Sequence, residues 1–364
     1  MKRVRTNYKI KWLGAALVLL LMAGCGKAAD GGDPPSPSPT PANESPAGEV
    51  DKSADPSQAG GDSNGNSSAA NPEESGINAT DSTGALLELP ATVERVACLT
   101  EICVDSLAEL GLAPVAVVPD SIAFQPEFFG DSPSSFVQIG GGFMEPSLED
   151  IAQANPDVVI GLKGTHDMLR DGLKSIAPLY IAELKTYEDS VAFLEMMGEW
   201  TGKEDAAAAA KKAFLDKIDH YKENSPNNRS ALILYGADVN FGIDTEGSLV
   251  GSLLAELTPY PWPAPAEDGG HQAGGMAYSL EKVLETDPDH IFIETFSFSP
   301  DSPPLSEQFA ANPLWGKLKA VQDSQITEVR TAIWANGRGT RSLSIVMDEA
   351  MSTLYPDTFK GSEQ

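Results

Sequence analysis

Two patterns of apolar and polar positions recur along residues 81–356. Segments with helical spacing, such as Val104, Leu107 and Leu110, follow a residue that can cap a helix, here Thr100, and precede a terminating Gly111. Between such segments lie short, nearly continuous apolar runs of the kind found in buried parallel strands, at residues 95–99, 114–118, 156–160, 230–235, 288–293 and 325–329. A further run at residues 86–90 predicts an edge strand. This alternation predicts an α/β fold with central parallel sheets.

One helix-and-strand unit occurs twice, 132 residues apart. The first copy begins at Ser147-Leu148-Glu149 and reaches Pro156-Asp157 before an apolar run; the second begins at Ser279-Leu280-Glu281 and reaches Pro288-Asp289. In each copy the Ser is placed to cap a short helix, and Pro-Asp ends that helix before the strand. A repeat of this length indicates two Rossmann-like lobes built on one plan, with a ligand cleft between them.

A long helical segment lies between the two copies. Residues 190–224 have high helix propensity almost throughout, and only Gly198 and Thr201-Gly202 weaken it. We therefore expect one long rigid α-helix to join the lobes and to limit hinge motion. The predicted organisation is a signal peptide (1–24), a tether (25–80), an N-terminal lobe (81–187), a linking helix (188–226) and a C-terminal lobe (227–364).

The first 25 residues resemble the export signal of bacterial lipoproteins. Basic residues precede an apolar stretch at residues 13–22, which is too short for a stable membrane span, and the stretch ends at Ala23-Gly24-Cys25. The resemblance implies that Cys25 is lipidated and becomes the mature N-terminus. The alternative is an ordinary secretory signal with an incidental Cys. We expect a lipid-anchored protein on the extracytoplasmic side of the cell membrane.

Composition changes after Cys25. Residues 26–80 are rich in Pro, Ser, Gly, Asn and Asp, which predicts a disordered tether long enough for a Gram-positive-type envelope. The whole chain has 53 acidic and 25 basic residues and a net charge of -28. This charge argues against nucleic acid and anionic lipid surfaces as partners, so the membrane is reached through the lipid anchor only. Export permits a disulfide between Cys98 and Cys103, but two buried thiols are the favoured interpretation.

From about residue 81 to 356 the chain resembles the substrate-binding proteins of ABC importers for ferric siderophores, haem and cobalamin. The resemblance is carried by the segments 95–99, 109–111, 145–149, 156–160, 312–315 and 334–350 in this order after the lipid signal. It implies a monomer without a cofactor that delivers an Fe(III) chelate to the permease subunits of the importer. In that family the Glu of each Leu-Glu motif pairs with permease Arg residues, which assigns docking to Glu149 and Glu281.

Cleft loops supply the candidate ligand-binding residues. Arg338 and Arg341 are the first choice, because guanidinium groups bind carboxylate, catecholate or hydroxamate oxygens in bidentate fashion. Lys163 and His166 could add positive charge or hydrogen bonds. Phe143 takes the place of an Arg found in some hydroxamate-binding relatives, which argues against recognition of that type. The candidates for apolar walls are Trp334, Phe143, Met144 and Tyr278.

Four alternatives to this assignment can be weighed from the sequence. Haem or cobalamin could replace the ferric chelate, with His166, His271 or Tyr278 as haem ligand. Direct metal binding is disfavoured, because the chain has only four His and no His pair with ligand spacing. Catalysis is not predicted, since no Gly-x-Ser-x-Gly, Walker or His-Glu-x-x-His motif occurs. A surface adhesin or sensor without transport is the remaining alternative of another class.

Overall fold

The computed structural model describes residues 76–130, 136–264, 278–296 and 302–359. The signal peptide, Cys25, nearly all of the predicted tether and His271 lie outside the described residues. No helix in the described part of the chain combines the length and the apolar character that crossing a membrane requires.

Five parallel strands form the first sheet, in the order β5-β4-β3-β6-β7. Parallel strands are buried on both faces, and a core cluster lies against each face of this sheet. The strands are β3 (Val96–Cys98), β4 (Ala116–Val117), β5 (Val137–Gln138), β6 (Val158–Leu162) and β7 (Leu179–Ala182), and the α-helices around them are α1 (Glu101–Glu109), α2 (Pro126–Phe129), α3 (Leu148–Ala154) and α4 (Arg170–Leu173). Short 3-10 turns occur at Ile122–Phe124 and Asp167–Leu169. We call residues 76–186 the first half.

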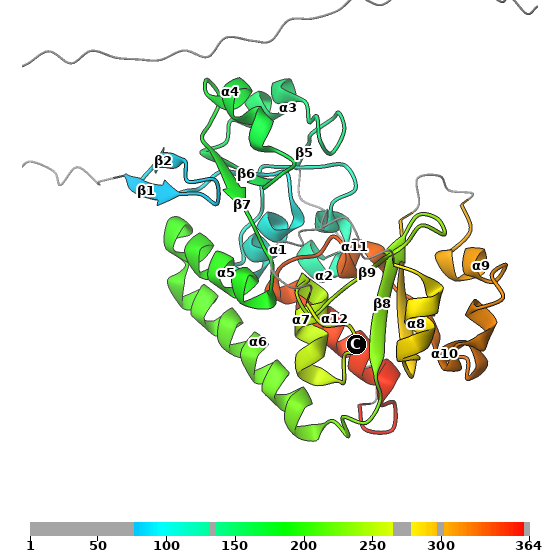
Figure 1. The fold of residues 1–364 in the computed structure, drawn as a ribbon. Helices are drawn as coiled ribbons and strands as arrows, with labels where there is room; N and C mark the ends of the chain where they lie inside the picture. The colour runs from blue at the N-terminus through cyan, green and yellow to red at the C-terminus, as the bar shows by residue number, and fades with distance from the viewer. Residues whose placement is uncertain (1–75, 131–135, 265–277, 297–301, 360–364) are drawn as a thin grey trace, which may run out of the picture. The chain divides into compact units, whose positions relative to one another are not determined.

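Four strands form the second sheet, in the order β11-β10-β8-β9, with only β9 antiparallel to its neighbour. The strands are β8 (Ala231–Gly236), β9 (Gly242–Ile243), β10 (His290–Thr295) and β11 (Ile326–Glu328). The helices are α7 (Leu249–Leu257), α8 (Leu280–Thr286), α9 (Leu305–Phe309), α10 (Lys319–Gln322), α11 (Thr331–Trp334) and α12 (Thr340–Leu354), with a 3-10 turn at Trp315–Lys317. The described part of residues 227–359 is called the second half. Two α/β halves with parallel sheets confirm the predicted fold class (Figure 1).

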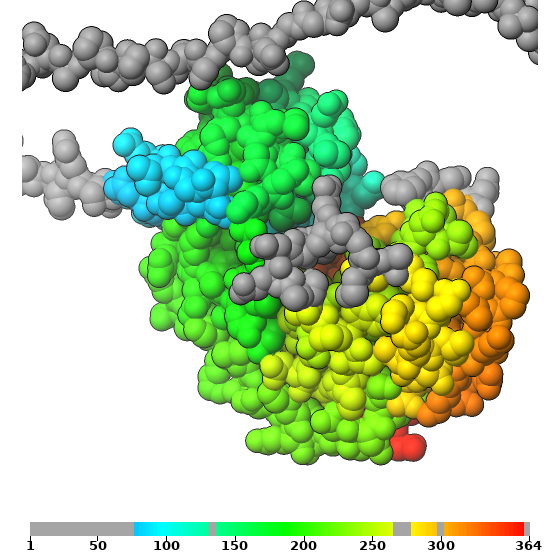
Figure 2. Space-filling view, viewed as in Figure 1, coloured from blue at the N-terminus to red at the C-terminus, as the bar shows by residue number. Residues whose placement is uncertain are grey.

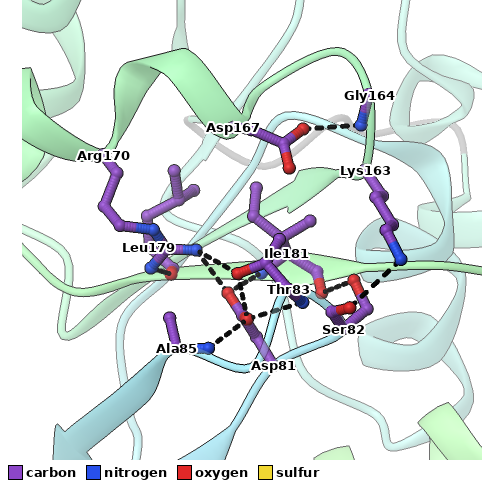
Figure 3. A network of polar contacts seen from close by, with 10 residues as sticks. All are labelled: Asp81, Ser82, Thr83, Ala85, Lys163, Gly164, Asp167, Arg170, Leu179 and Ile181. Carbon is purple, nitrogen blue, oxygen red and sulfur yellow. Dashed lines mark hydrogen bonds and ion pairs between the residues drawn. The ribbon is translucent and has the colours of Figure 1, made fainter. Parts of the chain in front are cut away.

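The predicted edge strand belongs to neither large sheet. β2 (Leu86–Leu89) pairs antiparallel with β1 (Ile77–Thr80) in a separate two-stranded hairpin. Its turn is fixed by Asp81, whose carboxylate accepts hydrogen bonds from the backbone N–H groups of Thr83 and Ala85 and pairs with Arg170 (Figure 3). Burial opposes ionisation of Asp81, but the bonds from Thr83 and Arg170 outweigh it and lower its pKa. Strand β1 therefore lies within residues that the sequence assigned to the tether.

The single linking helix is wrong. The segment forms two helices, α5 (Tyr187–Thr201) and α6 (Glu204–Asn224), separated by Gly202 in the left-handed region at φ 64°. The two helices pack against each other. Lys211 on α6 pairs with Glu195 on α5, and the helices approach so closely that a Cβ on Gly198 would lie 2.6 Å from the Ala207 Cβ. Figure 2 shows the green surface of α5 and α6 adjoining both the blue-to-green first half and the yellow second half.

Helix α12 ties the two halves together. It packs against α1, α5 and α6, and one continuous core cluster contains residues of both large sheets. The Asp105 carboxylate on α1 accepts hydrogen bonds from Ser342 N at 2.8 Å and Arg341 N at 3.1 Å, so it caps the start of α12 from the other half. Gly339 makes this approach possible, since a Cβ there would meet Asp105 Oδ1 at 2.1 Å. This connection supports the expected limit on hinge motion.

Cys98 and Cys103 form a disulfide, with their Cα atoms 5.5 Å apart. The interpretation of two buried thiols is therefore wrong. The bond joins the end of β3 to α1, and both residues lie in the core.

Candidate functional site

Both copies of the repeat adopt the same structure. Ser147 Oγ accepts from Asp150 N at 3.2 Å and Ser279 Oγ from Lys282 N at 3.4 Å, so each Ser caps a seven-residue helix. Each helix ends at a left-handed residue, Asn155 at φ 44° and Asp287 at φ 41°. The local signals in the sequence therefore predicted both units correctly.

The Asp that follows each Pro fixes the neighbouring strand. Asp157 Oδ2 accepts from the backbone N–H groups of Glu94 and Arg95, directly before β3. Asp289 Oδ2 accepts from Ser230 N and Oγ, directly before β8. The two halves thus use one arrangement to hold helix, strand and adjacent strand together.

Glu149 and Glu281 lie at equivalent places in the two copies. Each is the second residue of its helix, in α3 and α8, and each side chain is exposed. Neither forms an ion pair with another residue in the described ranges. Their position is compatible with a contact to a second protein, and their docking role remains a prediction.

Phe143 and Met144 lie on an exposed loop of the first half, with 54% and 55% of their surfaces accessible. The loop is held by His166, which is fully buried. Leu162 N donates to His166 Nδ1 at 2.9 Å, so Nε2 carries the proton and donates to the Phe143 carbonyl oxygen at 2.7 Å. Burial lowers the pKa of His166 and favours the neutral ring, although the hydrogen bond to Phe143 raises the pKa.

This use of both ring nitrogens removes His166 from the candidate ligand contacts. It also removes His166 as a haem ligand, because an iron bond would require a nitrogen that already has a partner. His166 positions the Phe143 loop instead.

Lys163 belongs to the network that holds the β1–β2 hairpin. Its Nζ donates to the Ser82 carbonyl oxygen at 3.2 Å (Figure 3). It also donates to Glu183 Oε2 at 2.8 Å. Lys163 thus has a structural role at the hairpin, and its contact with a ligand stays a prediction.

Arg341 also has a structural role. Its Nη1 donates to the carbonyl oxygens of Glu127 at 3.0 Å and Phe128 at 3.4 Å, and its Nη2 donates to the Ala108 carbonyl oxygen at 3.2 Å. These bonds join the start of α12 to the ends of α1 and α2. The guanidinium group, predicted to bind ligand, is engaged by main-chain oxygens of the first half.

Trp334 lies in the core with 1% of its surface exposed. Its ring packs 4.8 Å from that of Phe292, and its Nε1 donates to Glu349 Oε2 at 2.7 Å. This placement removes Trp334 from the predicted ligand wall, because a buried, hydrogen-bonded indole has no surface to offer.

Arg338 remains as a candidate cation. It precedes α12 and forms no ion pair within 4.0 Å among the described residues. Protein atoms surround its guanidinium group, and this desolvation lowers its pKa, while the charges of Asp244 and Glu294 act in the opposite direction. Ser190 Oγ donates to its main-chain oxygen at 2.6 Å, which fixes the backbone.

Asp244 and Glu294 were not predicted from the sequence. Burial raises the pKa of Asp244 to about 6 and that of Glu294 well above its usual range, and the charge of Arg338 lowers both. Glu294 occupies the place in the second copy that Leu162 holds in the first. A carboxylate at the end of an apolar run, where the other copy has Leu, was the signal that could have identified it.

Tyr278, the last predicted wall residue, is half-buried beside this group. Its ring lies 6.4 Å from that of Trp262. Burial raises the pKa of Tyr235 to about 12, and the charges of Asp244 and Tyr278 add to this effect. Tyr278 and Arg338 therefore belong to the second half and Phe143 and Met144 to the first; no hydrogen bond joins the two groups within the ranges described.

A separate cavity of about 330 Å³ lies between β1 and α5. None of the predicted ligand-binding residues contributes to it, and its one charged lining residue is Glu199, which does not suit an anionic chelate. The lining residues are Ile77, Asn78, Ala79, Thr80, Met196, Glu199 and Trp200.

Known proteins support one assignment. YhfQ of Bacillus subtilis (strain 168), provisionally named an ABC transporter substrate-binding lipoprotein, is 27% identical over 276 residues, which cover 73% of this chain and 85% of YhfQ. The Fe(3+)-citrate-binding protein YfmC of the same organism is 26% identical over 271 residues, covering 72% of this chain and 82% of YfmC.

The crystal structure of the petrobactin-binding protein YclQ from Bacillus subtilis matches with a TM-score of 0.64 at 19% identity, over 77% of this chain and 98% of that one. At this identity the match supports the fold alone. The family model described as periplasmic binding protein matches residues 96–332, well over half of the chain. The protein therefore belongs to the periplasmic binding protein family.

Proposed function

We propose that this protein is the substrate-binding protein of an ABC importer, which captures an iron(III) chelate of the siderophore or citrate type and delivers it to the permease. The observation that carries the proposal is the duplicated unit, which places one exposed Glu in each half. The desolvated guanidinium group of Arg338, in the second half, adds a candidate ligand contact. The role is one of binding and transfer, without catalysis and without a cofactor of its own.

Arg338 supports an anionic cargo. A guanidinium group keeps its positive charge even in a desolvated setting, and it donates several hydrogen bonds in a fixed plane. The charges of Asp244, directly after β9, and of Glu294, the penultimate residue of β10, act on Arg338. Ligands of open α/β sheets are commonly bound at the carboxyl ends of parallel strands such as β10. The relative YfmC is named for binding Fe(3+)-citrate, a chelate rich in carboxylate oxygens.

The exposed pair Glu149 and Glu281 supports transfer to a permease. Two carboxylates on equivalent surfaces of the two halves match a partner with two similar subunits, and such charges determine orientation and association rate more than affinity. We further propose that Cys25 carries a lipid that holds the protein, as a monomer, on the extracytoplasmic face of the cell membrane.

Charge reversal tests the transfer step. The double variant Glu149→Arg with Glu281→Arg should bind the ferric chelate as the wild type does, but should fail to support iron uptake by cells that lack the native protein. Glu307→Arg, an exposed acidic position on α9 outside the repeat, is the matched control and should support normal uptake. Normal uptake by the double variant would refute docking and favour an adhesin or sensor.

A further inference from the structure

Glu294 is a buried carboxyl group to which no group in the described part of the chain donates a hydrogen bond. It is 3% exposed, and its Oε1 has no partner among the described residues. An ionised carboxylate in such a place has a large desolvation cost, which a protein usually avoids by keeping the group protonated. A neutral carboxylic acid can then donate one hydrogen bond to an acceptor.

The strand register places this group on the face of β10 that packs against the segment containing Trp334. Alternate residues of a strand share a face, so Glu294 lies on the same face of β10 as Phe292, which contacts Trp334. Glu294 is two residues nearer the carboxyl end of the strand, and Arg338 is four residues beyond Trp334 in the segment that leads to α12. Burial and the charge of Asp244 raise the pKa of Glu294 and the charge of Arg338 lowers it, as expected when a cation lies nearby.

Neighbouring strands complete a row of polar groups on this face of the sheet. Tyr235 is the parallel partner of Glu294 and Gly242 the antiparallel partner of Tyr235, so Asp244, two residues after Gly242, has the same face. Gly242 leaves room for the Tyr235 ring, because a Cβ there would meet that ring at 2.1 Å. The ionisable groups that act on Glu294 or are acted on by it are Asp244, Arg338, Tyr235 and Tyr260.

We propose that Glu294 contacts the cargo as a neutral carboxylic acid and donates a hydrogen bond to an anionic oxygen of the chelate bound at Arg338. This inference rests on the proposed function and narrows the cargo to chelates with anionic oxygens at their periphery, such as carboxylates. At a pH at which Glu294 is ionised in the ligand-free protein, Glu294 takes up one proton from solvent when the chelate binds. Affinity for such a chelate therefore falls as the pH rises through the titration of Glu294.

The test compares ferric citrate binding by the full chain in detergent at pH 6, 7, 8 and 9 for the wild type and Glu294→Gln. Gln has the same shape, stays neutral and can still donate, so the two proteins should bind equally at low pH. As Glu294 ionises, the wild type should weaken relative to the variant, by up to about tenfold per pH unit. Comparing both proteins at each pH cancels changes in the chelate itself.

Two further variants complete the design. Glu294→Leu, which copies the first repeat, removes the donor and should weaken binding roughly tenfold at every pH. Glu307→Gln should follow the wild type throughout, since this residue is exposed and lies outside the row. Calorimetry of the wild type in two buffers of different ionisation enthalpy, at the pH where the two affinities diverge, should report a proton uptake that Glu294→Gln lacks.

The outcomes separate the two claims. If ferric citrate and other ferric chelates bind at no pH, the proposed function fails. If ferric citrate binds but the ratio of affinities between wild type and Glu294→Gln stays constant with pH, or Glu294→Leu binds as the wild type does, the role of Glu294 is wrong while the proposed function stands.

Discussion

His166 provides a quantitative test of how the first half is built. The ring is fully buried, it accepts from Leu162 N and it donates to the Phe143 carbonyl oxygen. His166→Ala removes both bonds and leaves a buried N–H group and a carbonyl oxygen without partners. It also opens a cavity beside Gly161, whose Cβ position is 2.8 Å from the His166 Cβ.

The expected loss of stability follows from these contacts. Leaving a buried donor or acceptor unpaired costs about 1–3 kcal/mol, and partial solvation of the Phe143 loop reduces the penalty for the carbonyl. We therefore expect His166→Ala to lower the free energy of unfolding by about 2–4 kcal/mol at pH 7.5. With a denaturant slope of about 3 kcal/mol per M, the urea midpoint should fall by about 1 M.

Urea unfolding of the full chain, followed by circular dichroism, measures this shift. His220→Ala is the matched control, because His220 is exposed on α6, and its midpoint should stay at the wild-type value. Burial lowers the pKa of His166, so its stabilising contribution is present above the unfolded pKa of about 6.5 and is lost as the pH falls through the lower folded value. The difference between wild type and His166→Ala should therefore shrink toward pH 5. Equal midpoints for His166→Ala and His220→Ala at pH 7.5 would refute the assigned role.

Two further predictions concern the junction between the halves and a buried carboxyl group of the first half. Gly339→Ala should lower the free energy of unfolding by about 1–3 kcal/mol, because its Cβ would collide with Asp105, whereas Gly316→Ala, with nothing within 4 Å, should have little effect; equal thermal midpoints would contradict this. Burial raises the pKa of Glu101 to about 7, although hydrogen bonds from Ser121 and Ile122 act in the opposite direction. The protonated form therefore stabilises the fold, and this stabilisation is present below the usual pKa of 4.5 and is lost as the pH rises from there through 7. Between pH 6 and 8 the wild type should lose about 1 kcal/mol relative to Glu101→Gln, and a constant difference in chemical unfolding would show that Glu101 does not titrate there.

Local signals in the sequence were sufficient for the repeated unit. Ser caps, the Pro-Asp pair and the apolar run act over a few residues, so they define helix, turn and strand without knowledge of the rest of the fold. The left-handed residues Asn155 and Asp287, which end the two helices, fit the tolerance of Asn and Asp for that conformation. The same reasoning gave the α/β class, because strands and helices alternate.

Local sequence signals did not predict the break in the linking segment. High helix propensity on both sides of Gly202 favours one helix, but propensity differences are small beside the energy of packing. Gly202 adopts the left-handed conformation, and α5 then packs on α6. The choice between a straight helix and a hairpin thus depends on contacts between distant residues.

The structure divides the predicted site residues into two groups. Arg338, Phe143, Met144 and Tyr278 keep places compatible with ligand contact, whereas Arg341, Lys163, His166 and Trp334 are engaged in the structure. Residue type could not separate these groups, because an Arg that holds a chelate and an Arg that holds two helix ends have the same chemistry. Only the positions of the main-chain oxygens around Arg341 distinguish them.

The most direct test of the central claim is a tryptophan-fluorescence titration of the full chain in detergent with ferric citrate, ferric catecholate and hydroxamate chelates, haem and cobalamin. The account predicts saturable binding of an anionic ferric chelate. Arg338→Ala should weaken that binding about tenfold or more, because a charge-assisted hydrogen bond is lost. Arg341→Ala should retain the affinity once its fold is verified by circular dichroism. Saturation by haem or cobalamin alone, no response to any ferric chelate, or an Arg338→Ala protein that binds as the wild type does would contradict the account.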